Sequence, residues 1–220
     1  MLNNPSAERV DRTVQALTPA FRGDPVYTWL LHTFDSSDHD SVRRELLRAF
    51  FTQCALNDGL FIEVDDYGSC GLLIPPGAAA ENPWTLLQAG IVPALWNIGL
   101  GTFKRAFLEY APSTERMMEE AFTEEERKNH WYVFIMGTSA DRRRQGLSSA
   151  LVQNMQEKAR TDGRPIWLEA TTEASQNLYL KHGFQNHGEI ILFGKGKVGR
   201  DGLLKKAGEG ILIWSMSWRP

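Results

Sequence analysis

The feature that most constrains the fold is a strand, a loop and a helix that follow one another in the second half of the chain. Residues 130–137 (HWYVFIMG) are aromatic and β-branched, which is typical of a buried strand. The apolar positions of 147–162 recur at helical spacing and stop before a glycine. A second apolar run, 165–170, precedes a predicted helix over 173–182 that a glycine closes. The order β, α, β, α favours an α/β fold in which helices cover a sheet.

Shorter elements flank this unit. Asp24-Pro25 predicts the start of a short helix, because an aspartate caps the first amides and proline is tolerated in the first turn. A second helix is predicted over 41–56, with Asp40 or Ser41 as its cap. Turn-forming residues separate further predicted strands, at 60–64, 70–74, 190–193 and 211–218. We therefore expect a mixed sheet with an antiparallel end.

The 220 residues suit one elaborated α/β domain, so we expect a single domain over 1–220. Residues 78–129 lack strand alternation and carry many large apolar side chains, which predicts a helical insertion. The uncharged stretch 82–103 is long enough to span a membrane, but prolines, glycines and polar residues interrupt it. It is interpreted as buried or amphipathic helix, and no membrane partner is expected.

Charge and cysteine usage exclude other classes of protein. The chain has 24 Lys and Arg against 27 Asp and Glu, a formal net charge of −3, so nucleic acid is not an expected partner. Cys54 and Cys70 cannot form a disulfide framework, and without CxxC or HExxH motifs no metal is expected. The first residues lack the basic and apolar regions of a signal peptide, which favours a cytoplasmic location.

The loop before the predicted helix 147–162 has the chemistry of an anion site. Three arginines, 142–144, precede Gly146 and the small Ser148. A helix N-terminus offers amide donors and a positive dipole end, and small residues let a phosphate approach the backbone. The alternative interpretation is a solvated basic turn before an ordinary helix.

Two segments carry a resemblance that favours the anion site. Residues 143–148 (RRQGLS) match the Gln/Arg-x-x-Gly-x-Gly/Ala pyrophosphate loop of the GNAT superfamily of acyl-CoA N-acyltransferases. Glu169 followed by 177–184 (NLYLKHGF) resembles the second segment of that family, and Asp24-Pro25 with 73–77 is similar to fungal members and to puromycin N-acetyltransferase. Ser148 stands where the family usually has Gly or Ala, and Ala140 where a proline is common.

The resemblance implies a GNAT-like α/β fold, a mixed and mostly antiparallel sheet flanked by helices, with the coenzyme A and catalytic segments in 130–189. It implies acetyl-CoA as co-substrate, its pantetheine arm paired with the end of the strand 130–137 like an extra strand. The implied contacts of coenzyme A are Met136, Gly137, Thr138, Arg143, Arg144, Gln145, Gly146, Leu147, Ser148, Ser149 and Asn177.

The resemblance also suggests the acid and the base. Tyr179 is the candidate that protonates the departing thiolate, because a phenol is protonated at neutral pH. Glu169 is the candidate base, since a carboxylate within an apolar strand is costly unless it is paired or functional. Three alternatives remain: Glu169 forms a structural ion pair, Glu63 or Asp65 is the base, or a water chain accepts the proton. Neither cysteine has an adjacent histidine, so direct transfer is favoured over an acyl-cysteine.

The predicted function is transfer of an acetyl group from acetyl-CoA to a primary amine of a small molecule. Trp84, Trp96 and Phe107 of the insertion favour a covered acceptor pocket, although they could also be core residues. A protein or peptide N-acetyltransferase is the first alternative, and a non-catalytic coenzyme A sensor is the second.

One further motif is set aside. Residues 194–199 (GKGKVG) satisfy GxGxxG after a predicted strand, but no helix follows them, so a dinucleotide site lacks its required context. This lysine-rich stretch is interpreted as a mobile, solvated loop.

Overall fold

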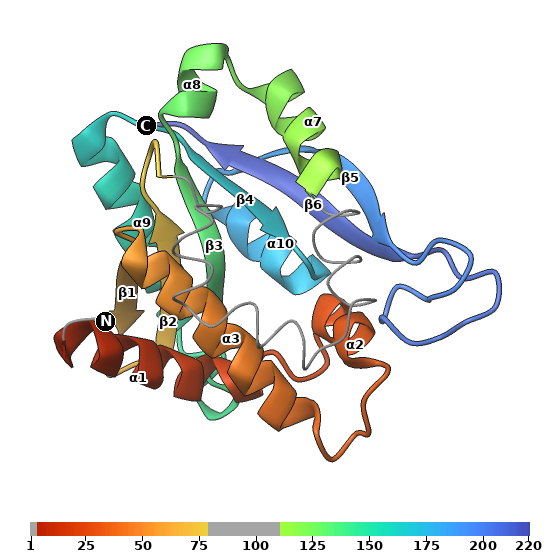
Figure 1. The fold of residues 1–220 in the computed structure, drawn as a ribbon. Coiled ribbons are helices and arrows are strands. Elements are labelled where there is room, and N and C mark those ends of the chain that lie inside the picture. Colours follow the sequence, from red (N-terminus) through yellow and green to blue (C-terminus); the bar gives the residue numbers. More distant parts are fainter. Residues whose placement is uncertain (1–3, 79–110) are drawn as a thin grey trace.

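The structure is a computed structural model that describes residues 4–78 and 111–220. It contains a six-stranded sheet in the order β1-β2-β3-β4-β6-β5, flanked by helices on both faces (Figure 1). The strands are β1 (Leu60–Val64), β2 (Ser69–Ile74), β3 (Trp131–Thr138), β4 (Ile166–Ala170), β5 (Gln185–Phe193) and β6 (Ile211–Trp218). The helices described are α1 (Asn4–Ala20), α2 (Pro25–Leu31), α3 (His39–Leu56), α7 (Ala111–Ala121), α8 (Glu124–Lys128), α9 (Leu147–Asp162) and α10 (Glu173–Lys181).

The sheet is mixed and mostly antiparallel, as predicted. Only β3 and β4 run parallel among the described strand pairs. Helices α1 and α3 cover one face beside β2 and β3, and α9 and α10 cover the other (Figure 1). We call these the α1/α3 face and the α9/α10 face. The predicted β, α, β, α unit is therefore present, from β3 through α10.

Several predicted boundaries need correction. The helix predicted from 41 begins at His39 with Asp38 as its N-cap, so neither Asp40 nor Ser41 caps it. The Asp40 carboxylate instead accepts hydrogen bonds from Arg22 and Arg43, the latter at 2.6 Å. The strand predicted at 190–193 begins five residues earlier, at Gln185.

The sequence interpretation missed helix α1 altogether. Its buried side chains, Val10, Val14 and Leu17, recur at helical spacing and pack against α3 and β2. The helix also lies close to β3: a Cβ built on Gly137 would come within 2.9 Å of Leu17 Cδ2. Glycine at this position therefore lets the end of β3 approach α1.

A β-bulge changes the direction of side chains in β3. Leu72 of β2 pairs with Ile135, but the next residue, Leu73, pairs with Val133, so Phe134 is the extra residue. Val133 belongs to the apolar cluster of the α9/α10 face, whereas Phe134 and Ile135 both pack on the α1/α3 face. The bulge thus shifts the alternation of side chains by one residue before the strand ends.

The predicted insertion 78–129 is described only in part. Helices α7 and α8 lie within it, and α8 begins with a capping box in which Thr123 and Glu126 bond each other's backbone amides. Three residues of the predicted insertion, Trp84, Trp96 and Phe107, and the whole uncharged stretch 82–103 lie outside the described residues. Within residues 4–78 and 111–220, no helix combines the length and apolarity needed to span a bilayer.

The contact of α1 with the sheet gives a stability prediction. Leu17 is fully buried, so Leu17→Ala should lower the free energy of unfolding by about 2–5 kcal/mol, because it leaves a cavity. Urea denaturation measures the loss. Gln15→Ala, on the exposed side of the same helix, should change stability by about 0.5 kcal/mol or less. Equal effects of the two substitutions would contradict the packing of α1.

Candidate active site

The site begins where two neighbouring strands separate. Strands β3 and β4 pair only at Trp131 with Ile166 and at Tyr132 with Trp167. Beyond these pairs, β3 continues beside β2 and β4 continues beside β6, so the two strands diverge (Figure 1). Residues 133–138 of β3 therefore present a backbone edge toward the gap. An extended ligand can pair with such an edge as an added strand.

Glu169 lies at the start of this gap. It is on β4, two residues after the last paired position, and its carboxylate reaches across to β3. Tyr132 Oη donates to Glu169 Oε2 at 2.8 Å, and Trp167 Nε1 donates to Oε1 at 2.6 Å. Each carboxylate oxygen thus receives a donor from a neutral aromatic side chain, which fixes the orientation of the group.

The indole that holds Glu169 is itself fixed. Trp167 is fully buried; the Phe122 ring meets it edge-on at 5.2 Å, and the His187 ring stacks on it at 5.6 Å. His187 Nε2 lies 2.7 Å from Ser217 Oγ on the next strand. The support of Glu169 therefore extends across β4, β6 and β5.

Tyr179 lies on the other face of the sheet. Its side chain is buried in the cluster that contains Leu168 and Ala170, the neighbours of Glu169 along β4. Because side chains alternate along a strand, Glu169 points to the α1/α3 face and Tyr179 packs on the α9/α10 face. The Phe184 ring lies 5.3 Å from the Tyr179 ring. Burial raises the pKa of the Tyr179 phenol above its ordinary value, so the hydroxyl is protonated at neutral pH.

The predicted anion loop connects β3 to α9 and contains two residues with positive φ. A short 3-10 turn, Ala140–Arg142, is followed by Arg144 with φ 62° and by Gly146 with φ 81°. Gly146 is the N-cap of α9 and makes no side-chain cap hydrogen bond, so the first amides of the helix have no partner within the helix. Arg143 Nη2 donates to the carbonyl of Ala20 at 2.9 Å, which attaches the loop to the end of α1.

The serine at the small position of the loop is accommodated by a chain of hydroxyl groups. Ser148 Oγ lies 2.7 Å from Thr138 Oγ1, and Thr138 Oγ1 lies 2.9 Å from Ser69 Oγ. Ser69 is fully buried on β2. The Ser148 hydroxyl therefore faces the end of β3, and three elements share one hydrogen-bonded chain at the start of α9.

The other predicted contacts of coenzyme A lie around this loop. Gln145 is exposed and accepts from Arg142 at 3.4 Å, Leu147 packs toward Gly68, and Met136 packs on the α9/α10 face. Asn177 is exposed on α10. The structure thus gathers most of the predicted residues at the end of β3 and the start of α9, with Asn177 on the neighbouring helix.

The turn between β1 and β2 supports the same loop from the other side. Asp65, Asp66 and Tyr67 all have positive φ, a costly backbone for residues other than glycine. Asp65 pairs with Arg142 of the loop, and Asp66 pairs with Arg12 of α1. The Arg12 guanidinium lies 4.2 Å from the centre of the Tyr67 ring.

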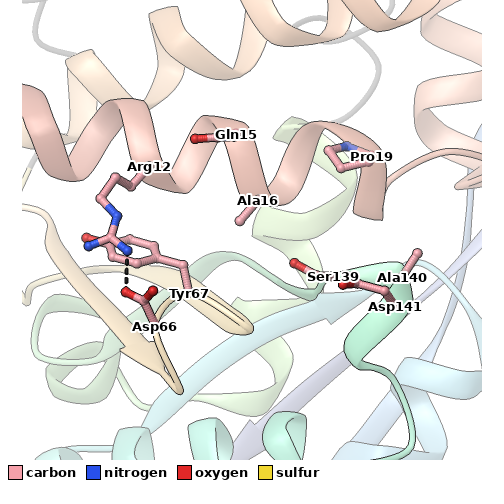
Figure 2. Close-up of a pocket in the computed structure, with 9 residues that line it drawn as sticks. All are labelled: Arg12, Gln15, Ala16, Pro19, Asp66, Tyr67, Ser139, Ala140 and Asp141. Atoms are coloured by element: carbon pink, nitrogen blue, oxygen red, sulfur yellow. Dashed lines mark hydrogen bonds and ion pairs between the residues drawn. The ribbon is translucent and has the colours of Figure 1, made fainter.

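Figure 2 shows the space between this turn, α1 and the loop. It is a cavity of about 450 Å³ lined by Arg12, Gln15, Ala16, Pro19, Asp66, Tyr67, Ser139, Ala140 and Asp141. Neither Glu169 nor Tyr179 lines it. The cavity therefore belongs to the support of the loop rather than to the gap between β3 and β4.

The alternative bases lie elsewhere. Glu63 is on β1, with β2 and β3 between it and β4, and its carboxylate accepts from the Tyr67 amide at 3.0 Å. Asp65 is occupied by its ion pair with Arg142. Burial raises the pKa of the Cys54 and Cys70 thiols to about 12, so neither forms a thiolate at neutral pH. No cluster of metal-ligating side chains occurs among the described residues.

The sequence interpretation missed three residues of this site. Tyr132 and Trp167 were treated as apolar strand residues, although Trp167 and Glu169 are two apart and so share a face. Thr171, just beyond β4, donates to Asp24 Oδ2 at 2.7 Å. Asp24 also caps α2 as predicted, and burial raises the pKa of its carboxyl group. This contact attaches α2 to the end of β4.

Known proteins share this sequence pattern and fold. The family model described as Acetyltransferase (GNAT) family matches residues 23–184. An uncharacterized N-acetyltransferase of Schizosaccharomyces pombe is 24% identical over 193 residues, which cover 85% of this chain and 77% of the relative. The resemblance to fungal members is thereby confirmed, while the resemblance to puromycin N-acetyltransferase stays a prediction.

Solved structures show the same fold at low sequence identity. Arylalkylamine N-acetyltransferase 2 of Aedes aegypti matches with a TM-score of 0.59 and 13% identity, over 100% of this chain and 97% of that one. The Drosophila melanogaster polyamine N-acetyltransferase matches with a TM-score of 0.57 and 9% identity, over 97% of this chain and 96% of that one. A Corynebacterium glutamicum structure described as histone acetyltransferase HPA2 and related acetyltransferase matches with a TM-score of 0.57 and 19% identity. The match covers 100% of this chain and 94% of that one.

The family match extends from Gly23, the residue before Asp24, through Phe184, which follows the glycine after α10. It therefore includes the diverging strands, the loop before α9 and Glu169. The chain belongs to the acetyltransferase (GNAT) family and is an acyl-CoA-dependent N-acetyltransferase.

Proposed function

We propose that the enzyme transfers an acetyl group directly from acetyl-CoA to a primary amine of a small molecule. The observation that carries the proposal is the position of Glu169 at the start of the gap between β3 and β4, with both oxygens held by Tyr132 and Trp167. A carboxylate fixed beside an open strand edge can accept a proton from an amine that attacks there.

The residues around the gap fit coenzyme A. Backbone groups of Met136, Gly137 and Thr138 at the end of β3 can pair with an extended amide-containing arm. The amides at the start of α9, after Gly146, suit a pyrophosphate, and the exposed Arg143 and Arg144 add positive charge. When bound, acetyl-CoA supplies a thioester carbonyl whose developing negative charge the backbone amides of β3 can stabilise.

The chemistry then requires one base and one acid. A bond forms between the amine nitrogen and the thioester carbonyl carbon, and the carbon–sulfur bond breaks. Glu169 accepts the proton lost by the amine, and Tyr179 donates a proton to the leaving thiolate. Exchange with solvent returns both groups to their starting states. Because Glu169 and Tyr179 lie on opposite faces of the sheet, the amine approaches from one side while sulfur leaves toward the other.

The surroundings of Glu169 favour a small acceptor. Tyr132 packs within the apolar cluster of the α1/α3 face, and its ring meets Phe134 edge-on at 6.4 Å. A compact aromatic setting suits an amine with an apolar body better than an extended peptide backbone, which needs hydrogen-bond partners along its length. The similar structures are named for arylalkylamine, polyamine and histone acetylation, so their shared fold does not select among these acceptors.

Thiol release from acetyl-CoA across arylalkylamines, polyamines and peptides tests the acceptor class. We expect the highest kcat/KM with small amines. A preference for peptides would favour the protein N-acetyltransferase alternative. Binding of acetyl-CoA without thiol release on any amine would favour the sensor.

Acetyl-CoA binding should depend on the loop before α9. Arg143→Glu places a carboxylate beside the proposed phosphate position, so calorimetry should show binding weakened at least about tenfold. Gly146→Asp should act in the same direction, because it adds negative charge at the N-cap. Arg44→Glu, an equal charge change on the exposed side of α3, is the control and should leave affinity within about twofold. Unchanged affinity in both loop variants would place the phosphates elsewhere.

Glu169→Gln should lower the rate of acetyl transfer by about 10²- to 10⁴-fold, because the amide keeps the shape of the side chain but cannot accept the proton. The affinity for acetyl-CoA should stay near normal. Glu189→Gln is a matched control, since Glu189 also lies on a strand and accepts from an indole, that of Trp214, at 3.1 Å. If the Glu169 variant instead keeps its rate, Asp24, which is attached to the end of the same strand, becomes the next base to test.

Tyr179→Phe removes one oxygen and little packing. Single-turnover rates with a poor acceptor amine should fall by about 10²- to 10⁴-fold, while stability and acetyl-CoA affinity are retained. Tyr67→Phe removes the same oxygen from the turn between β1 and β2 and should have no effect on the rate. A wild-type single-turnover rate in the Tyr179 variant would show that this residue only packs in the core.

A further inference from the structure

The loop between β5 and β6, residues 194–210, extends away from the rest of the fold (Figure 1). Its backbone is bonded within itself: the Gly196 amide donates to Gly208 at 2.8 Å, and the Gly210 amide donates to Val198 at 2.8 Å. Val198 is fully buried and packs with Trp29 of α2. The loop is therefore a folded projection attached to the body of the protein, although the sequence pattern favoured a mobile one.

Two large apolar side chains stand exposed on this projection. Leu203 is 58% exposed and Leu204 is 68% exposed, and among the described residues only Leu180 on α10 is a comparable exposed hydrophobic residue, at 44%. Asp201 Oδ1 accepts from the Leu203 amide at 3.0 Å, which fixes the turn that presents the pair. Adjacent exposed leucines are costly in water unless a partner covers them.

Positive charge surrounds the two leucines. Two carboxylates, Asp201 and Glu209, also lie in the loop, and Glu209 pairs with Lys205 at 3.5 Å. The loop thus has a local excess of three positive charges on a chain whose net charge is −3. The exposed cations of the loop are Lys195, Lys197, Arg200, Lys205 and Lys206.

We propose that this loop docks on the surface of an anionic phospholipid membrane. Leu203 and Leu204 enter the boundary between headgroups and acyl chains, and the surrounding lysines and Arg200 contact the anionic headgroups. Long cationic side chains keep their charge at the headgroups while their stems lie against apolar groups. Each cation near an anionic bilayer adds to the attraction.

The shape of the loop favours a membrane over a protein partner. The leucines follow Gly202, which packs closely against Pro25 and Thr28 of α2, while their own side chains are exposed. A fluid bilayer closes around exposed apolar side chains without a preformed groove. Cations also flank the leucines on both sides along the chain, with Arg200 before them and Lys205 and Lys206 directly after them. This proposal does not depend on the acceptor of the acetyl group. It departs from the expectation, drawn from the sequence, that the chain has no membrane partner.

Vesicle sedimentation tests the proposal with the full-length protein. Vesicles of phosphatidylcholine with about 30% phosphatidylserine should pellet the protein, and vesicles of phosphatidylcholine alone should pellet much less. Raising NaCl from about 0.05 M to about 0.5 M should weaken the binding, because salt screens the headgroup charge. Failure to pellet with the anionic vesicles at low salt would overturn the proposal.

Two double variants separate the apolar and charged contributions. Leu203→Asn with Leu204→Asn should lower the vesicle partition coefficient at least about tenfold, and Lys195→Gln with Lys206→Gln should lower it by about tenfold. The matched controls are Leu180→Asn on α10 and the pair Arg44→Gln with Lys181→Gln, which should each stay within about twofold. All the altered side chains are exposed, and thermal melting verifies that the variants fold.

Two results would contradict insertion of the leucines into a membrane. Vesicle binding that survives loss of both leucines would indicate nonspecific attraction of anions and would overturn insertion. Self-association in size-exclusion chromatography that the leucine variant abolishes, without vesicle binding, would show that the leucines contact a second copy of the chain. Either result would contradict docking by insertion of Leu203 and Leu204.

Discussion

The separation of β3 from β4 is the constraint on which the rest of the structure depends. Two pairs of residues hold these parallel strands together, and every later backbone group on the facing edge of β3 needs another partner. The hydrogen bond from Tyr132 to Glu169 spans the strands where their pairing stops. A sheet that opens in its centre therefore brings a fixed carboxylate together with a strand edge that, among the described strands, has no further pairing partner.

Keeping this opening in place requires support from both sides. The β-bulge at Phe134 shifts the alternation of side chains at the end of β3 by one residue. Helix α1 packs so closely on Gly137 that a side chain at this position would clash with Leu17. Across the loop, the hydroxyl chain from Ser69 to Ser148 joins β2, β3 and α9. The left-handed turn between β1 and β2 adds an ion pair to the loop at a cost in backbone strain. Strain of this kind is retained where the surrounding contacts outweigh it, and here those contacts fix the loop that precedes α9.

Local patterns in the sequence were sufficient for most elements and for the members of the site that lie within a motif. Glu169 was identifiable because a carboxylate in an apolar strand is unusual, and the loop before α9 because arginines precede a glycine and a helix. Tyr132 could not be identified as a residue of the site, because its role depends on the pairing of β3 with β4. At least 28 positions along the chain separate any residue of β3 from any residue of β4. Helix α1 was identifiable from Val10, Val14 and Leu17, but its prolines at positions 5 and 19 obscured the pattern.

The position of the proposed acid and base on opposite faces of the sheet follows from the alternation of side chains along β4. Leu168 and Ala170 point toward Tyr179, so the residue between them must point away from it. A proton donor on the same face as Glu169 could hydrogen-bond to the carboxylate, as the Tyr132 hydroxyl does. Here the sheet separates Tyr179 from Glu169, and in the proposed reaction the thioester carbon lies in the gap between β3 and β4, where it is reached from both sides. Burial of Tyr179 then has a chemical consequence: it raises the pKa of the phenol and keeps it protonated. On the other face, Tyr132 and Trp167 each donate to one oxygen of Glu169 and fix the orientation of its carboxylate. The fold therefore places a buried phenol on one side of the gap and an oriented carboxylate on the other, which is the arrangement that the proposed transfer step requires.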